Sequence, residues 1–140
     1  MQQLQISEIA RAIGCANAPP GAIDRIVTDS RAAEPGALFI AFCGERVDGN
    51  DFVPQALQQG AAAAVAERLV SGADASRVML VPDAKRAMIQ IGGLYRDRFE
   101  LPIVGVTGSV GKTTTKEFIY AVLSKRYCTH KNEGNQNNEL

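Results

Sequence analysis

The residues whose types and spacing point most directly to chemistry lie in the segment LPIVGVTGSVGKTTTK, residues 101–116. Its apolar, β-branched run at 103–106 predicts a buried parallel strand, and the glycines that follow predict a loop that opens into a helix at Gly111. Glycines let backbone N–H groups approach an anion, and the helix N-terminus adds partial positive charge. Lys112 can reach terminal phosphates, and the Thr113 hydroxyl can bind Mg²⁺. The segment therefore predicts a phosphate-binding loop for a nucleoside triphosphate.

This loop has the short pattern G-x-x-G-K-T, residues 108–113, and Val106 stands where the longer phosphate-loop pattern has glycine. The surroundings support the interpretation, because a strand is expected before the loop and an amphipathic helix after it. The apolar face of that helix is formed by Phe118, Ile119, Val122 and Leu123. The alternative is a glycine-rich strand-to-helix turn that carries a solvated lysine.

The composition excludes several classes of protein. The chain has 140 residues, of which 46% are hydrophobic and 21% charged, and this is typical of a folded globular protein. That length holds one ordinary domain, or a small domain plus a piece of another. Fifteen acidic residues balance fifteen basic ones, so the bulk charge favours neither nucleic acid nor a membrane surface as a partner.

The apolar stretches are too short to span a bilayer, and the N-terminus lacks a basic region followed by an apolar core. We therefore expect a cytoplasmic protein. Cys15, Cys43 and Cys128 are odd in number, widely spaced and without a C-x-x-C pair. Free reduced thiols are expected, rather than a disulfide framework or a zinc site. His130 is the only histidine, and it is given no role.

The first 82 residues alternate between expected strands and helices. Ser7 is a candidate N-cap for a helix at 8–13, and Asp51 is a candidate N-cap for a helix that Gly60 ends. Expected strands lie at 23–28, 37–42, 61–66 and 78–81. The second of these strands is apolar throughout and is therefore expected to be buried on both faces. The alternation predicts an α/β fold, a small domain with a partly parallel sheet.

A longer helix is expected after Pro82 and Asp83, with apolar residues at helical spacing on one side and basic residues on the other. Gly92 and Gly93 inside it each cost about 1 kcal/mol relative to alanine, which indicates close packing against a neighbour or a bend. We interpret this helix as a bridge between two domains. The expected division is a first domain at 1–82, the bridge at 83–100 and the start of a second domain at 101–140.

Two loops of the first domain carry further candidate site residues. The first, TDSR at 28–31, brings a hydroxyl, a carboxylate and a guanidinium to a strand end. The second, at 44–51, places Arg46 and Asp48 on a glycine-rich loop after the next strand. Ligands usually lie at strand ends in α/β sheets, and an arginine with nearby hydroxyls and amides suits a diphosphate. From spacing alone, the favoured alternative is an Asp-Ser turn with an exposed arginine, beside an ordinary polar loop.

Five segments of the chain form a joint pattern that is much more specific than the phosphate-binding loop alone. They are TDSR at 28–31, PGALFIAFCGERVDGNDF at 35–52, GAAAAVAE at 60–67, PIVGVTGSVGKTTTKE at 102–117 and NEGNQNNEL at 132–140. In order and spacing they resemble the Mur ligases of peptidoglycan synthesis, and the resemblance covers nearly the whole chain. Asn50 stands where relatives often have histidine, and Val110 where they often have asparagine, so the details of those loops stay open.

The resemblance implies a three-domain cytoplasmic ligase that uses ATP and Mg²⁺, of which this chain carries the first domain and the opening of the second. It implies that the first domain holds the UDP end of a UDP-sugar through Asp29, Ser30, Arg31, Gly44, Arg46 and Asp48. It implies an ATP site formed by Gly108, Ser109, Val110, Gly111, Lys112, Thr113 and Thr114. Lys112 would supply the catalytic counter-charge. Thr113 would bind Mg²⁺, Glu139 would bind a second Mg²⁺, and Asn137 and Asn138 would lie near the substrate.

The ending GNQNNE is similar to family members that join D-alanyl-D-alanine to UDP-MurNAc-tripeptide. In the implied reaction the substrate carboxylate attacks the γ-phosphate of ATP, and the amine of the dipeptide then displaces phosphate from the acyl phosphate. The carboxylate and the triphosphate are both anions, so Lys112 and Mg²⁺ must offset their repulsion.

Other hypotheses stay open. One is a sibling ligase that adds another amino acid, or a folylpolyglutamate synthase-like enzyme, which would share the short phosphate loop but not TDSR and GERVDGNDF. Another is a non-catalytic module that binds a UDP-sugar or a nucleotide. The 40 residues at 101–140 cannot bury the first strand of a P-loop sheet on both faces. We therefore expect residues 1–82 to fold, the remainder to be only partly stabilised, and this chain alone to be inactive.

Overall fold

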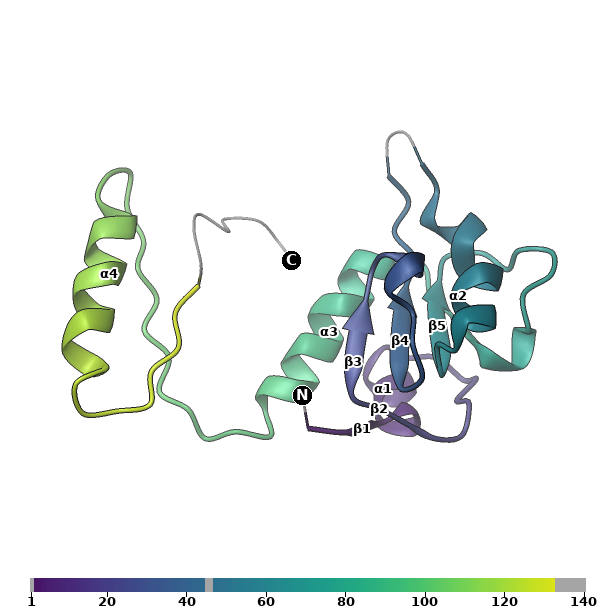
Figure 1. Ribbon diagram of the computed structural model, residues 1–140, viewed down its shortest axis with the longest axis horizontal. Coiled ribbons are helices and arrows are strands. Elements are labelled where there is room, and N and C mark those ends of the chain that lie inside the picture. Colours follow the sequence, from purple (N-terminus) through teal and green to yellow (C-terminus); the bar gives the residue numbers. More distant parts are fainter. Residues whose placement is uncertain (1, 45–46, 133–140) are drawn as a thin grey trace. The chain divides into compact units, whose positions relative to one another are not determined.

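The computed structural model describes residues 2–44 and 47–132, and it divides into a first unit that ends at Phe99 and a second unit that begins at Glu100. The first unit holds a four-stranded parallel sheet in the order β3-β4-β5-β6 (Figure 1). Its strands are β3 (Arg25–Val27), β4 (Ala37–Ile40), β5 (Ala63–Ala66) and β6 (Val78–Leu80). A separate antiparallel pair joins β1 (Leu4–Gln5) to β2 (Ala22–Ile23). The α/β class expected from the sequence is confirmed.

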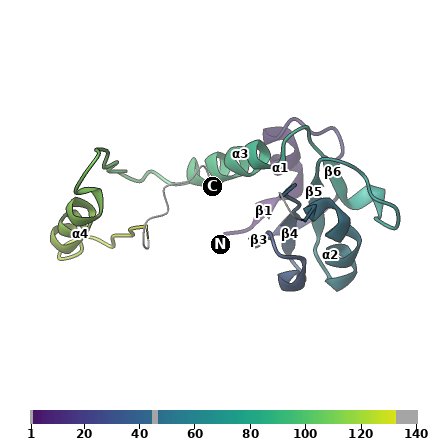
Figure 2. The same cartoon turned by 90° about the horizontal axis from the view of Figure 1, so that it is seen from above.

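Helices cover both faces of the parallel sheet, as Figure 2 shows. On one face lie α1 (Ile6–Ala12) and α3 (Ala84–Arg96), and on the other lies α2 (Val53–Gln59). Short 3₁₀ helices lie at Ser30–Ala32, Gly49–Phe52 and Ala75–Arg77. Parallel strands need crossover connections, and the covering helices bury the central strands on both sides. Every residue of β4 and β5 is accordingly buried.

Local end signals predicted one start and one end of a helix correctly. Asp83 caps α3, because its side chain accepts a hydrogen bond from the N–H of Arg86 at 3.0 Å. Gly60 ends α2 with a φ of 118°, in the left-handed region that glycine occupies without strain. These signals need only a few neighbouring residues, so they can be read from the sequence.

Two helix starts differ from the sequence prediction. Helix α1 begins one residue before the expected cap Ser7, and its first turn is fixed by Glu8, which accepts a hydrogen bond from the N–H of Gln5 at 3.2 Å. The expected cap Asp51 lies inside a 3₁₀ turn that Asp48 caps instead. The bonding residue thus lies after the expected cap in the first case and before it in the second.

The single strand expected at 23–28 is two strands that belong to different sheets. Strand β2 pairs with β1, whereas β3 pairs with β4. The change occurs at Asp24, whose N–H donates to the carbonyl of Gly36 at 3.0 Å. Asp24 and Arg25 are both polar and interrupt the alternation there, but this local pattern does not show which distant strand pairs with each side. The other expected strands of the first unit form over shorter ranges than predicted.

The C-terminal end of α3 is joined to the beginning of the first unit. Arg98 donates to the carbonyl of Gln3 at 2.8 Å and to the carboxylate of Glu8 at 2.5 Å. The hydroxyl of Tyr95 accepts a hydrogen bond from the N–H of Gln2 at 3.0 Å. The two ends of this unit therefore lie side by side.

Gly92 and Gly93 lie on the exposed side of α3, which runs through both without a break. A Cβ added at either position would meet nothing within 4 Å among the described residues. The close packing expected at these glycines is therefore not found in the described part of the chain. The role of this helix as a bridge between domains stays a prediction.

The second unit contains α4 (Lys112–Leu123), which follows an extended segment. The buried strand expected at 103–106 does not form within residues 100–132, and Ile103 and Val104 are 65% and 60% exposed. A buried strand needs neighbouring strands for its N–H and C=O groups and covering helices for its side chains. Residues 100–132 supply no neighbouring strand, so the prediction of a buried strand is wrong for the described part of the chain.

Within the described ranges, no helix is both long and apolar enough to cross a membrane. Cys15, Cys43 and Cys128 are free thiols, as the sequence predicts.

Candidate functional site

A cavity in the first unit opens at the carboxyl ends of β3 and β4. Its volume is about 580 Å³, which is within the range of small-molecule sites. The described residues that line it are Thr28, Asp29, Ser30, Arg31, Phe39, Phe42, Val47, Gly49, Phe52 and Gln55. Ligands of parallel α/β sheets bind at this edge. The structure thus brings three of the predicted site residues, Asp29, Ser30 and Arg31, to one cavity.

Asp29 and Arg31 are ion-paired at this cavity. The carboxylate of Asp29 accepts a hydrogen bond from the backbone N–H of Arg31 at 3.0 Å and one from its guanidinium Nη2 at 2.7 Å. Hydrogen bonds from the Arg31 side chain and backbone lower the pKa of Asp29 to about 2. The Arg31 side chain is 82% exposed, so a ligand from solvent can reach a guanidinium whose direction Asp29 fixes.

Ser30 is buried, in contrast to its two neighbours, with only 6% of its surface exposed. Its hydroxyl donates to Oε1 of Gln55 at 3.2 Å. This bond ties the turn after β3 to helix α2, and it places a hydroxyl and an amide together in the cavity wall.

The sequence reasoning missed the aromatic side of the cavity and the contribution of α2. Phe42 comes after β4 at the same edge of the sheet, so the strand-end rule that pointed to Asp29 could have found it. Phe52 and Gln55 are three residues apart, which puts them on one side of a helical turn. No sequence signal places that turn beside the end of β3.

The loop that brings Val47 to the cavity is closed at its base. Cys43 and Asp48 form an antiparallel bridge, and the N–H of Gly44 donates to the carbonyl of Val47 at 3.0 Å. Gly44 and Asp48, both predicted to bind the UDP-sugar, therefore shape the loop. The predicted residue Arg46 lies outside the described residues.

The carboxylate of Asp48 is held from two sides. Arg68 donates to Oδ2 through Nη2 at 2.7 Å, and the side-chain amide of Asn50 donates to Oδ1 at 2.6 Å. The hydrogen bond from Arg68, followed by those from Asn50, lowers the pKa of Asp48 to about 2. Asp48 is therefore ionised at neutral pH, and both bonds to the base of the loop persist there.

The second unit places its glycine loop at the start of α4. Gly108 and Gly111 have φ values of 146° and 80°, which other residues adopt only with strain, and Gly111 is the N-cap of the helix. The first backbone bond of the helix runs from the N–H of Thr115 to the carbonyl of Gly111 at 2.9 Å. The N–H groups of residues 112–114 therefore point ahead of the helix, where an anion can bind.

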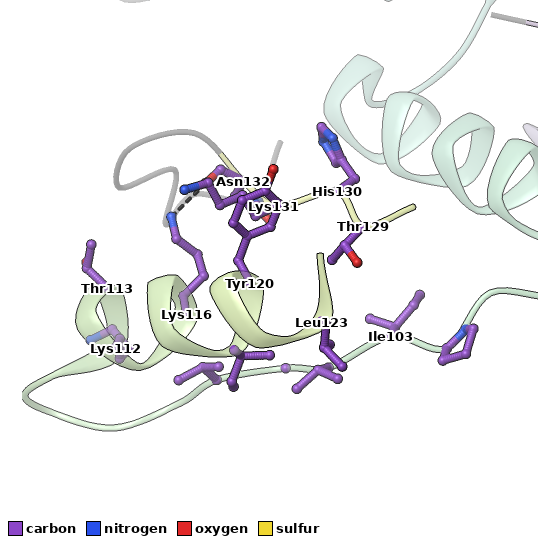
Figure 3. Close-up of a pocket in the computed structure, with 15 residues that line it drawn as sticks. Ile103, Lys112, Thr113, Lys116, Tyr120, Leu123, Thr129, His130, Lys131 and Asn132 are labelled. Atoms are coloured by element: carbon purple, nitrogen blue, oxygen red, sulfur yellow. Dashed lines mark hydrogen bonds between the residues drawn. The ribbon is translucent and has the colours of Figure 1, made fainter. Parts of the chain in front are cut away.

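Lys112 turns back toward this loop, and its ammonium donates to the carbonyl of Gly108 at 2.7 Å. Lys112, Thr113 and Lys116 line a cavity of about 440 Å³ (Figure 3). Lys116 donates to the carbonyl of Asn132 at 2.6 Å. Two lysines thus lie near the helix N-terminus, an arrangement that suits a polyphosphate, whereas much of the remaining cavity lining is apolar and comes from residues 102–106 and the side of α4.

The remaining predicted ATP-site residues lie in the glycine loop and the first turn of α4, and they do not line this cavity. Ser109 and Val110 form the bend between the two glycines, and Val110 is 90% exposed. Thr114 lies in the first turn of α4. The expected spacing of the loop is therefore present, although the strand expected before it is not formed in the described residues.

A preformed metal site is not found in the part of the chain that the structure describes, where no group of three or more His, Cys, Asp or Glu residues converges. The predicted ligand Glu139 and the predicted substrate residues Asn137 and Asn138 lie outside that part. The described residues fit Mg²⁺ through the hydroxyl of Thr113 at the helix N-terminus. Mg²⁺ commonly takes its other ligands from substrate phosphates and water.

Comparison with known proteins identifies two family models in this chain. The model described as "Mur ligase family, catalytic domain" matches residues 22–93, and the one described as "Mur ligase middle domain" matches residues 106–140. The first match includes the described cavity of the first unit, and the second includes the glycine loop and α4.

The similar individual proteins include D-alanyl-D-alanine ligases and also 2,6-diaminopimelate ligases, of which the one from Alkaliphilus metalliredigens is 38% identical over 72% of this chain and 21% of its own length. The UDP-N-acetylmuramoyl-tripeptide–D-alanyl-D-alanine ligase of Synechocystis is 50% identical over 119 residues, which cover 84% of this chain and 26% of that ligase. The crystal structure of MurF from Acinetobacter baumannii matches with a TM-score of 0.87 and 35% identity, over 99% of this chain and 31% of that one. MurF ligase from Thermotoga maritima in complex with ADP matches with a TM-score of 0.74 and 39% identity, over 81% and 26% of the two chains. The chain spans about a quarter of the length of the Synechocystis relative.

Proposed function

The chain belongs to the Mur ligase family, and from that premise we propose that it serves an ATP-dependent ligase that joins D-alanyl-D-alanine to UDP-MurNAc-tripeptide during peptidoglycan precursor synthesis. The observation that carries the proposal is the 50% identity to the Synechocystis ligase of that name, over 84% of this chain. The ADP bound to the Thermotoga relative supports ATP as the second substrate. The proposal includes a cytoplasmic location, where ATP is available to the reaction.

In this proposal the first unit binds the UDP end of the precursor in its cavity of about 580 Å³. Arg31 pairs with a phosphate, and the hydroxyl of Ser30 and the amide of Gln55 supply neutral polar contacts. Gly44, Arg46 and Asp48 belong to the loop beside the cavity. The proposed domains are residues 1–82 for this function, 83–100 as a bridge, and 101–140 as the start of the ATP-binding domain.

The second unit binds the triphosphate of ATP in this proposal. Backbone N–H groups between Gly108 and Thr114 hold the phosphates, and Lys112 supplies the positive charge nearest to them. When bound, Mg²⁺ would neutralise phosphate charge, with Thr113 as a ligand of one ion and Glu139 as a ligand of a second. Asn137 and Asn138 are proposed to contact the substrate.

The proposed reaction has two steps. A carboxylate oxygen of the tripeptide attacks the γ-phosphorus of ATP, so that ADP leaves and an acyl phosphate forms. The amine nitrogen of D-alanyl-D-alanine then attacks the acyl carbon, loses a proton and expels inorganic phosphate. In the first step two anions approach each other, and Lys112 offsets their repulsion where the charge develops.

A titration tests the first half of the proposal. We expect UDP-MurNAc-tripeptide to bind the 140-residue chain saturably and to be displaced by UDP. Arg31→Ala is expected to weaken binding by about tenfold to a hundredfold, because a charged hydrogen bond contributes about 1.5–3 kcal/mol. Arg25→Ala is the matched control, since Arg25 pairs with Asp24 and Glu34. Absence of binding to the unaltered chain would contradict the proposal.

A chimera tests the second half. This chain replaces the matching segment of the Synechocystis ligase, and release of phosphate is measured with ATP, UDP-MurNAc-tripeptide and D-alanyl-D-alanine. We expect phosphate release that requires both other substrates. A folded chimera without such turnover would contradict the assignment.

A further inference from the structure

Asn50 is a buried polar side chain, and its role was not apparent from the sequence. Only 2% of its surface is exposed, and it lies among the large, fully buried side chains of the first unit. A buried amide must have hydrogen-bond partners to offset the loss of water. Asn50 has such partners on two different segments, and this sets it apart from an ordinary turn residue.

The two partners of Asn50 connect the cavity loop to the sheet. Its Oδ1 accepts a hydrogen bond from the backbone N–H of Glu67 at 2.9 Å, directly after β5. Its Nδ2 donates to Oδ1 of Asp48 at 2.6 Å, at the base of the loop. The side chain of Glu67 in turn accepts a hydrogen bond from the N–H of Ala84, at the first residue of α3. Asn50 therefore ties the base of the loop to the rigid part of the fold, in addition to the bond from Arg68 to Asp48.

The backbone beside Asn50 leaves little room for another arrangement. The N–H of Gly49 donates to the carbonyl of Phe42 at 2.8 Å. A Cβ at Gly49 would lie 2.5 Å from that carbonyl oxygen, so the two segments are in direct backbone contact. Phe42, Val47 and Gly49 all line the cavity. The position of the loop base therefore determines the shape of one side of the cavity.

We propose that Asn50 is a positioning residue for the UDP-sugar site, because its bond to Asp48 holds the described base of the loop, residues 47–49, in the arrangement that lines the cavity. The inference rests on the proposed function. Asn50 need not touch the ligand. Without this bond to Asp48, the ligand must order residues 47–49 as it binds, and that ordering lowers affinity.

The alternative is that Asn50 only stabilises the fold. Asn17 makes a suitable comparison, because its amide also ties a loop to a distant part of the first unit. It donates to the carbonyl of Val78 at 2.8 Å and to that of Ala75 at 3.2 Å. Its partners lead into β6, whereas the described cavity lies at β3 and β4. Loss of this tether affects stability without changing the cavity loop.

The experiment compares Asn50→Asp with Asn17→Asp in the 140-residue chain. The exchange at Asn50 keeps the side-chain shape and the acceptor for Glu67, but it removes the donor to Asp48 and places two carboxylates together. Binding of UDP at neutral pH is measured by calorimetry, and thermal unfolding is measured in parallel. We expect UDP affinity to fall about tenfold or more for Asn50→Asp, and to stay within about twofold for Asn17→Asp.

The outcomes separate the inference from the proposed function. If the unaltered chain does not bind UDP, the proposed function fails and the inference fails with it. If the unaltered chain binds and Asn50→Asp binds equally well, only the inference is overturned. If Asn50→Asp does not fold, Arg68→Met is measured instead, because it removes the hydrogen bond from Arg68 to Oδ2 of Asp48. Unchanged UDP affinity in a folded Arg68→Met chain would then overturn the positioning role of this linkage.

Discussion

The two units contain similar sequence patterns but differ in how much of each pattern is buried. In the first unit, the apolar run of β4 is paired on both sides and covered by helices on both faces, and Ile40 is fully buried. In the second unit, the apolar run at 103–106 also precedes a loop and a helix, yet Ile103 is 65% exposed. Burial of such a run depends on neighbouring strands, so the pattern alone does not determine it.

The same contrast applies to the two candidate sites. The cavity of the first unit is formed by residues far apart in the sequence, such as Ser30 and Gln55. The glycine loop of the second unit is held by short-range bonds, such as that from Lys112 to Gly108. A site built from local bonds keeps its geometry without a surrounding core, whereas the first site requires a folded sheet.

The largest expected effect tests the contrast in burial. Ile40→Ala should lower the free energy of unfolding of the first unit by about 2–5 kcal/mol, because it leaves a cavity in a packed core. Ile103→Ala removes the same atoms from an exposed position and should change stability by no more than about 0.5 kcal/mol. Urea unfolding followed by circular dichroism measures both. Similar losses from the two variants would show that Ile103 is buried in solution and would contradict the difference in burial between the two units.

The next effect tests whether the two sites work separately. In the chimera, Lys112→Ala should lower ATP-dependent phosphoryl transfer by about 10²- to 10³-fold, because it removes a positive charge aimed at the phosphates. Affinity for UDP-MurNAc-tripeptide should be nearly unchanged, since Lys112 lies in the other unit. Steady-state phosphate release and calorimetry measure the two quantities. Equal loss of both would contradict a division of labour between the units.

A smaller effect concerns close backbone packing in the first unit. Gly49→Ala should destabilise the chain by about 1–3 kcal/mol, because the new Cβ would lie 2.5 Å from the carbonyl oxygen of Phe42. Gly92→Ala is the control, since its Cβ meets nothing within 4 Å among the described residues. It should stabilise helix α3 by up to about 1 kcal/mol. Thermal unfolding checks the opposite signs, and a stabilising Gly49→Ala would contradict the observed packing.

The smallest expected effect is a loss of folding stability at acidic pH. The hydrogen bond from Arg68 lowers the pKa of Asp48 to about 2, from an ordinary value of 3.8, with Asn50 adding to it and Asp51 sharing the same guanidinium. Because the folded-state pKa is the lower one, this contribution to stability is complete above about pH 4 and is lost as the pH falls toward 2. The urea midpoint of the unaltered chain should therefore fall more over that interval than that of Asp48→Asn. Parallel curves would show that the ion pair contributes nothing in solution.

Parts of the fold were predictable because their causes are local. Asp83 starts α3 through a bond to Arg86, and Gly60 ends α2 through its backbone angle, so both signals involve only a few residues. The switch of sheets at Asp24 was not predictable, because it depends on which distant strand pairs with each side. The prediction of a buried strand at 103–106 failed for a similar reason, because the apolar pattern does not show whether partner strands are present.

The candidate site divides in the same way. Asp29, Ser30 and Arg31 follow a strand, so the strand-end rule is enough to point to them. Gln55 could not be found, because its place in the cavity depends on how α2 packs on the sheet. Asn50 stands out in the sequence only as a departure from the family pattern, and its burial between Asp48 and Glu67 gives it a role that the sequence did not suggest.

The bonds from Arg98 and Tyr95 to the start of the chain have a practical consequence. A short peptide could connect the two ends of the first unit, and new termini could be cut at the exposed turn around Gly72. Such a circular permutant would keep every strand of the sheet in its place. Under the proposed function, it would be a compact sensor for nucleotide sugars, with no sequence after Phe99 attached to it.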